Sequence, residues 1–121
     1  MSLPADSASL APLRSELDQW LEAAGVRGQS AFDTVAAVSE ATSNAIEHAL
    51  EPRSPRVEVS AVRADDMLRL QVRDFGRWRP PRFDSDRNHG LLLIDSLMTR
   101  VEIDRTDGGT TVTMELELAD G

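Results

Sequence analysis

The sequence predicts an α+β fold: a two-layer α/β sandwich with about three helices on one face of a largely antiparallel sheet of four to five strands. Two observations favour it. Apolar residues recur at helical spacing between residues 10 and 50, and from residue 57 the apolar spacing changes to two, in segments separated by turn sequences. The length of 121 residues and the absence of an internal repeat or linker predict a single domain, 1–121, alone or within a longer chain.

The first helix follows an extended or irregular lead-in at residues 3–9. Gly25 supplies its stop, because glycine readily takes the left-handed backbone that ends helices. Its apolar positions are Leu10, Leu13, Leu17, Trp20, Leu21 and Ala24.

A second helix is predicted from about Ala31 to Leu50. Ser30 with Asp33 three residues later forms an N-terminal capping box, and Pro52 and Pro55 close the helix. The apolar arc of this helix comprises Phe32, Val35, Thr42, Ile46 and Ala49.

Two hairpins supply the sheet. Residues 57–61 and 68–72 alternate apolar and polar side chains around the turn-forming residues 64–66. Residues 101–103 and 112–118 do the same around the turn at 107–109. Residues 76–89 show neither period and hold two prolines, which predicts a loop, and a short third helix is expected from Leu91 to about Met98.

The composition excludes several classes of function. All 13 basic residues are arginine, so a Walker A loop, a eukaryotic-type kinase site and Schiff-base chemistry, which each need a lysine, are ruled out. The chain has no cysteine and hence no thiolate site. The net charge of −8 argues against direct nucleic-acid binding. No signal sequence or membrane-spanning run is present, so we expect a cytoplasmic protein that does not bind membranes.

Asp74 is the first residue to suggest a site. Strand alternation places it with Leu68, Leu70 and Val72 on the face that the helices cover, where a carboxylate needs a hydrogen-bond donor. Thr110 has the same parity at the start of the last strand. Together they could recognise the edge of a purine ring. Alternatively, the strand ends before Asp74, and its side chain turns into water.

Glu40 and Asn44 form the second constellation. They lie one helical turn apart, away from the predicted apolar arc. A carboxylate and an amide so placed could serve as a general base and a magnesium ligand, since magnesium takes oxygen donors and keeps several waters. The alternative is a solvated helix face that also carries Asp33 and Glu47.

The loop before the third helix is locally basic and leads into Asn88, His89 and Gly90 at a helix start, where backbone amides favour phosphate. The alternative is an ordinary surface loop rich in arginine. The loop arginines are Arg77, Arg79, Arg82 and Arg87.

In these residues the sequence resembles the GHKL ATPase superfamily, the Bergerat-fold group of gyrase, histidine kinases and mismatch-repair proteins. Within it the chain is most similar to the bacterial anti-sigma-factor serine/threonine kinases. The resemblance rests on four motifs, which occur in the same order as in the family. The first is the N box at residues 39–49 (SEATSNAIEHA). The others are the two glycine boxes at 74–76 (DFG) and 87–94 (RNHGLLLI) and the terminal strand at 109–112 (GTTV).

The resemblance implies an ATP- and magnesium-dependent kinase. Glu40 would be the general base and Asn44 the magnesium ligand, and Asp74 with Thr110 would bind adenine. The remaining nucleotide contacts that it implies are His48, Gly76, Arg87, His89, Gly90 and Leu91.

The partners that the resemblance implies are a sigma factor and a small anti-sigma antagonist protein. The kinase would phosphorylate the antagonist on serine or threonine and otherwise sequester the sigma factor, in a partner-switching cycle. Arg14 on the first helix would contact these partners, and a homodimer is also implied.

Two positions depart from the family pattern, because Trp78 and Asn88 stand where glycines are usual. They favour an alternative, a non-catalytic module of the same fold that sequesters a sigma factor or antagonist with weak or no nucleotide binding. A third hypothesis, the ATPase part of a histidine kinase, predicts phosphoryl transfer to a histidine. The 13 residues between Gly76 and Gly90 hold nothing that resembles a phosphoacceptor domain.

Overall fold

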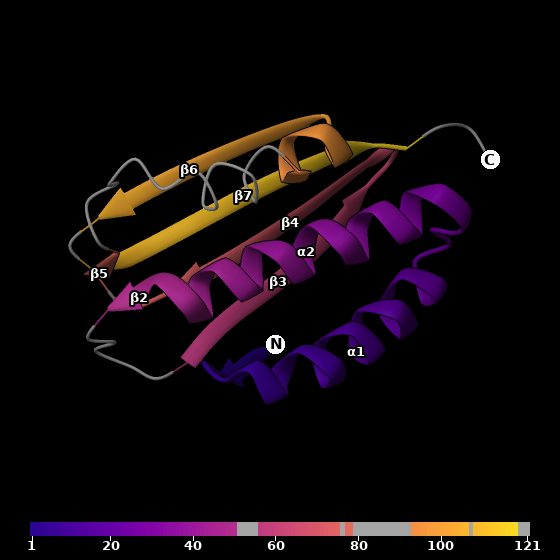
Figure 1. Ribbon diagram of the computed structural model, residues 1–121. Helices are drawn as coiled ribbons and strands as arrows, with labels where there is room; N and C mark the ends of the chain where they lie inside the picture. The colour runs from indigo at the N-terminus through magenta and orange to yellow at the C-terminus, as the bar shows by residue number, and fades with distance from the viewer. Residues whose placement is uncertain (51–55, 76, 79–92, 107, 119–121) are drawn as a thin grey trace.

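The computed structural model describes residues 1–50, 56–75, 77–78, 93–106 and 108–118, and at 47–50 and 77–78 it describes the backbone alone. The predicted two-layer architecture is confirmed. Helices α1 (Leu10–Ala23) and α2 (Gly28–His48), with a short helix at residues 93–97, lie against one face of an antiparallel sheet (Figure 1). No described helix is long and apolar enough to cross a membrane.

Five strands form this sheet in the order β1-β3-β4-β7-β6, and every neighbouring pair is antiparallel. Their bounds are β1 Ser2–Pro4, β3 Arg56–Ala64, β4 Met67–Asp74, β6 Arg100–Thr106 and β7 Gly109–Glu117. A short 3-10 helix, η1 (Ser7–Ser9), leads from β1 into α1.

The first hairpin has the predicted alternation and a two-residue turn. Asp65 takes a positive φ of 53°, as the tight turns that match strand twist require. The register pairs Val59 with Val72 and Ala61 with Leu70. All four side chains therefore fall on the face that the helices cover, as the period of two predicts.

The core lies between this face and the helices. Leu13, Leu17 and Leu21 of α1 are almost fully buried, and Ile94 of the short helix is a buried member of the same core. The sheet contributes Val57, Val59, Leu68, Leu70, Val72, Val112 and Met114.

The start of α2 differs from the prediction. The helix begins at Gly28, which has a φ of 65°, so Ser30 already lies within the first turn. The predicted capping box is therefore wrong. The Ser30 carbonyl accepts a bond from the Thr34 hydroxyl, and Asp33 accepts one from the side chain of Gln29. The left-handed conformations of Gly25 and Gly28 allow a tight connection from α1. Helix α2 therefore starts before Ser30, which cannot act as its N-cap.

The predicted apolar arc of α2 is also partly wrong. Phe32 is 69% exposed, whereas Thr42 is buried as predicted. The helix instead contacts the core through small residues, because short side chains let it approach the sheet closely. Its buried apolar residues are Ala37, Val38, Ala41 and Ala45.

Two short segments were not predicted as strands. Residues 49–50, expected at the end of the second helix, form β2 (Ala49–Leu50), and residues 77–78, expected in a loop, form β5 (Arg77–Trp78). The two strands pair antiparallel at the end of α2. The third helix is confirmed at residues 93–97. The rest of the predicted loop and the positions of Pro52 and Pro55 lie outside the described residues.

Truncation of Leu70 tests this core. Leu70 is fully buried in the central strand, so Leu70→Ala is expected to lower the free energy of unfolding by about 2–5 kcal/mol, measured by urea denaturation. Val62→Ala on the neighbouring strand is the control, because Val62 is 57% exposed and its truncation should cost within about 0.5 kcal/mol. Equal losses would contradict the assigned core face.

Candidate functional site

The adjoining ends of β4 and β7 hold a buried polar pair. Asp74 is 3% exposed and Thr110 is 2% exposed. The backbone N–H of Thr110 donates to Oδ1 of Asp74 at 3.3 Å. The alternative in which Asp74 turns into water is therefore wrong, and its carboxylate lies on the covered side of the sheet.

Gly109 permits this close approach of the two strand ends. It has a φ of 143°, and a Cβ atom there would lie 2.0 Å from the carbonyl oxygen of Asp74. The two residues that flank Asp74 also touch, because the guanidinium of Arg73 lies 4.8 Å from the ring centroid of Phe75, a cation–π contact. The end of β4 at Asp74 is thus in direct backbone contact with the start of β7.

Helix α2 carries buried polar side chains of its own. Within the helix, Thr34 and Thr42 satisfy their hydroxyls by donating to the backbone carbonyls four residues earlier, each at 2.7 Å. Asn44 differs from them. It is 6% exposed, and within the part of the chain that the structure describes its side-chain amide has no hydrogen-bond partner. A buried amide without a partner is costly and points to a ligand.

Glu40 lies in a different environment from Asn44. It is half-buried and lines a groove of about 420 Å³ between α1 and α2. The alternative of a solvated helix face is therefore wrong for Asn44, which is buried, and only Glu40 of the pair remains partly open to solvent.

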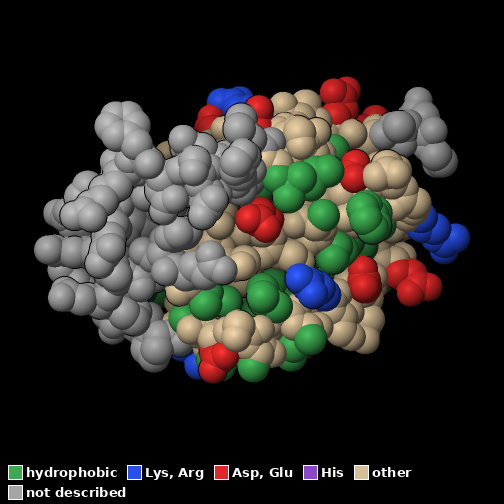
Figure 2. All heavy atoms as spheres, in the orientation of Figure 1, with side chains coloured by type: hydrophobic (Ala, Val, Ile, Leu, Met, Phe, Trp, Pro, Cys, Tyr) green, Lys and Arg blue, Asp and Glu red, His purple; other side chains and the backbone are tan. Residues whose placement is uncertain are grey.

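The same groove contains Arg14, the predicted partner contact. Arg14 is exposed on α1, and its Nε donates to the hydroxyl of Ser39 on α2 at 3.1 Å. The exposed ring of Phe32 is also part of the lining. Figure 2 shows this helical side of the molecule, where hydrophobic side chains lie among acidic and basic ones. Arg14 and Glu40 are thus brought to one groove, which sequence spacing did not predict.

Several predicted site residues lie outside the described residues, namely Gly76, Arg87, His89, Gly90 and Leu91. His48 is the last residue of α2, and its side chain is also outside the description. Among the described residues, no cluster of three His, Asp or Glu side chains could hold a metal ion.

Sequence reasoning missed Ser39 and Gly109. Ser39 lies inside the N box, and the hydrogen bond that it accepts from Arg14 connects two helices, so spacing along one helix gives no sign of it. Gly109 was noted only as part of a turn and a motif. Gly109 stands directly before Thr110, which the strand alternation places on the covered face. A glycine at the start of such a strand indicates that another backbone approaches closely, and this signal could have identified Gly109.

Comparison with solved structures shows similar folds. The RsbU and RsbW domains of Rv1364c from Mycobacterium tuberculosis match with a TM-score of 0.81 and 27% identity, over 100% of this chain and 33% of that chain. The histidine kinase domain of the blue-light activated histidine kinase from Erythrobacter litoralis EL346 matches with a TM-score of 0.62 and 22% identity, over 95% of this chain and 61% of that chain.

A third match is the SiaB–SiaC complex from Pseudomonas aeruginosa, with a TM-score of 0.64 and 15% identity, over 96% of this chain and 87% of that chain. The chain thus spans about a third of the length of the solved Mycobacterium chain and most of the Pseudomonas chain. The histidine kinase-like ATPase domain family matches residues 3–116, which include both strand ends and the whole of α2. This chain belongs to the histidine kinase-like ATPase domain family.

Proposed function

We propose that the chain is an ATP- and magnesium-dependent anti-sigma-factor serine/threonine kinase, formed by one domain over residues 1–121. The proposal rests on one observation, the burial of two polar side chains, Asp74 and Asn44. Burial of such groups costs free energy and adds nothing to apolar packing. Asp74 is buried at the end of β4, where it accepts a hydrogen bond from the Thr110 N–H, and Asn44 is buried on α2 without a hydrogen bond inside the described part of the chain.

These residues fit a magnesium nucleotide. In the proposal, Asp74 and Thr110 bind the adenine edge, and the amide oxygen of Asn44 is one oxygen ligand of magnesium. Because magnesium keeps waters and takes phosphate oxygens as ligands, one protein ligand suffices. When bound, ATP supplies the γ-phosphoryl group and magnesium neutralises its charge. The proposed nucleotide site also includes His48, Gly76, Arg87, His89, Gly90 and Leu91.

Glu40 is the proposed base that accepts the proton of the attacking hydroxyl. Its position in a groove open to solvent supports this role, because a protein substrate must reach the base from outside. Arg14 lines the same groove, and Ser39 holds its Nε, which leaves the terminal nitrogens to contact a docked protein.

The proposed partners are a sigma factor and an antagonist protein, bound in turn over this groove. The likeness to an RsbW domain and to SiaB in complex with SiaC supports a protein partner for this chain as well.

Thermal unfolding with nucleotide tests the proposal. A ligand of the native state raises the melting temperature, by an amount set by its concentration relative to Kd. We expect millimolar ATP with magnesium to raise it, and ATP with EDTA to raise it less. An unmoved melting temperature would overturn the kinase proposal.

Substitution of Glu40 tests its proposed role as the general base. Glu40→Gln keeps the side-chain volume but cannot accept the proton, so transfer of labelled γ-phosphate to a candidate antagonist protein should fall about a hundredfold. ATP binding should be unchanged. Glu22→Gln on the exposed side of α1 is the matched control and should transfer normally. Equal transfer by both variants would remove Glu40 from this role.

The second candidate is a non-catalytic binding module of the same fold. Trp78, at a position where glycine is usual in this kinase branch, favours it, because a bulky residue there opposes close approach of the backbone to nucleotide. This candidate predicts partner binding that is the same with and without magnesium-ATP.

A further inference from the structure

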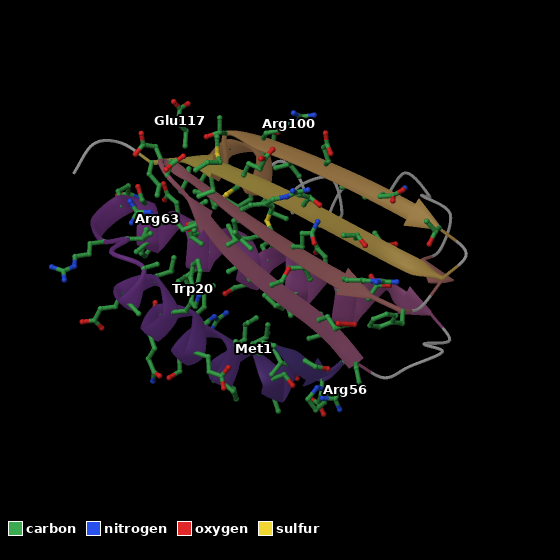
Figure 3. All side chains as sticks on the ribbon, turned by 180° about the vertical axis from the view of Figure 1, so that it is seen from behind. Met1, Trp20, Arg56, Arg63, Arg100 and Glu117 are labelled. Atoms are coloured by element: carbon green, nitrogen blue, oxygen red, sulfur yellow. The ribbon has the colours of Figure 1, made fainter. Side chains whose placement is uncertain are left out.

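The ring of Phe32 stands exposed at one end of the groove between α1 and α2. It is 69% exposed, more than any other large apolar side chain in the described part of the chain. Ala31 and Val35 line the same end of the groove. The indole of Trp20 on α1, by contrast, is half-buried and packs against the core beside β3 (Figure 3). An aromatic ring left exposed at a groove is typical of a binding surface, where such rings are enriched.

A carboxylate lines this end of the groove as well. The hydrogen bond from its Nε holds Arg14 level with Ser39, near the middle of the groove. Because α1 and α2 run antiparallel (Figure 1), Asp18, one turn beyond Arg14 on α1, lies on the Phe32 side of that bond. Among the described residues, neither a hydrogen bond nor an ion pair involves Asp18. An exposed ring and a carboxylate without a partner therefore lie at one end of the groove.

Glu40, the proposed base, lies towards the other end of the same groove. It follows Phe32 by eight residues on α2, a distance of about 12 Å along the helix axis. A substrate segment that brings a hydroxyl to Glu40 and follows the groove passes Phe32. In an extended chain, about four residues cover this distance. The substrate side chain that meets Phe32 then stands about four residues from the phosphorylated hydroxyl.

We propose that this end of the groove binds an arginine side chain of the protein substrate, about four residues from the hydroxyl that is phosphorylated. The guanidinium would lie over the face of the Phe32 ring and pair with the carboxylate of Asp18. The identity of the bound segment as the substrate rests on the proposed function, because it takes Glu40 as the base. The contacts with Phe32 and Asp18 themselves need no nucleotide.

The two side chains together favour arginine over other occupants. An apolar side chain would cover Phe32 but would also displace water from Asp18 without compensating its charge. A carboxylate would be repelled by Asp18, and the compact, strongly hydrated ammonium of lysine matches the ring less well. Arg14, the basic residue of the groove, does not neutralise Asp18, because no ion pair joins the two in the described structure. The net charge of −8 attracts a cationic segment further and disfavours a second copy of the chain.

A peptide titration tests the site. The probe is acetyl-Arg-Ala-Ala-Ala-Ser-Ala-Ala-Ala-Arg-amide, which places arginine four residues from serine on both sides and so fits either chain direction. We expect it to bind at millimolar concentration and to shift the backbone amide NMR signals of Asp18, Phe32 and Val35. The control peptide carries citrulline in place of both arginines. Citrulline keeps the shape and planarity of the side chain but has no charge, so this peptide should bind about tenfold more weakly.

Variants of the chain separate the two contacts. Asp18→Asn removes the charge and should weaken binding of the arginine peptide about fivefold, while leaving the citrulline peptide nearly unaffected. Phe32→Ala removes the ring and should weaken binding of the arginine peptide by a similar factor. Glu22→Gln is the control, because it makes the same charge change on the exposed side of α1, outside the groove lining, and should bind as the parent does. All three side chains are exposed, so the variants should keep the fold.

Four results would overturn the proposal. The first is the absence of binding at millimolar peptide, and the second is equal binding by the citrulline peptide. The third is an equal loss in Asp18→Asn and Glu22→Gln, which would mean that net charge alone attracts the peptide. The fourth is tighter binding of a peptide with leucine or glutamate in place of both arginines, because an apolar or acidic segment would then be the preferred occupant.

The titrations contain no nucleotide. Failure of the kinase proposal appears instead as an unmoved melting temperature with magnesium-ATP, so the two failures are distinguishable.

Discussion

We expect the Asp74→Asn variant to fold as the parent chain does but to bind ATP more weakly by about two to three orders of magnitude. Asparagine keeps the volume of the side chain and one oxygen that accepts the bond from the Thr110 N–H. It replaces the other oxygen with an amino group and removes the charge. Loss of one partner from a buried, charged hydrogen bond costs about 2–5 kcal/mol. The stabilisation of the chain by magnesium-ATP should therefore disappear in thermal unfolding.

The control for this prediction is Asp104→Asn, which makes the same charge change at an exposed position on β6. It should keep the full thermal shift with magnesium-ATP. Circular dichroism of both variants without nucleotide verifies that the fold is retained. A normal shift in Asp74→Asn would show that the buried carboxylate does not recognise the nucleotide, and the proposed adenine site would fail.

The strands could be predicted from the sequence because their signal is local. In β3, β4 and β7, apolar residues occupy every second position over most of each strand, and one face of the sheet is buried, so the alternation alone places Asp74 and Thr110 on the covered side. The hairpin turn follows from Asp65 and Asp66, which tolerate the tight turn that joins the strands.

The orientation of α2 could not be predicted in the same way. Bulky apolar residues such as Phe32 dominate a hydrophobic pattern, but this helix reaches the sheet through alanines and through threonines whose hydroxyls bond to their own helix. A polar side chain that is satisfied internally behaves as a small apolar one in packing. The buried stripe is therefore rotated from the predicted arc, and it includes Asn44.

Features that depend on pairing between distant segments were also beyond local reasoning. β2 and β5 are two residues each, too short to show a period, and they form only because the end of α2 meets the segment after β4. The hydrogen bond between Arg14 and Ser39 likewise depends on how α1 crosses α2. The resemblance to a family supplied the roles of site residues, whereas these contacts come only from the tertiary structure.

The close approach of Gly109 to β4 leads to the second large effect. A Cβ atom at this position would lie 2.0 Å from the carbonyl oxygen of Asp74, 2.9 Å from its carbonyl carbon and 3.0 Å from the Cα of Phe75. All three are backbone atoms, which cannot move without separating the strand ends, and the φ of 143° is itself unfavourable for alanine. Gly109→Ala is therefore expected to lower the free energy of unfolding by about 4 kcal/mol or more, measured by urea denaturation, and to abolish ATP binding.

Gly28→Ala separates the two causes of this loss. Gly28 also has a positive φ, of 65°, but a Cβ atom there would meet nothing within 4 Å, so its substitution carries backbone strain without overlap. It should cost about 1 kcal/mol and leave ATP binding intact. Equal losses in the two variants would mean that backbone strain alone accounts for the effect at Gly109. A larger loss at Gly109, together with loss of ATP binding, would show that contact between β4 and β7 holds Asp74 and Thr110 in the geometry that nucleotide recognition requires.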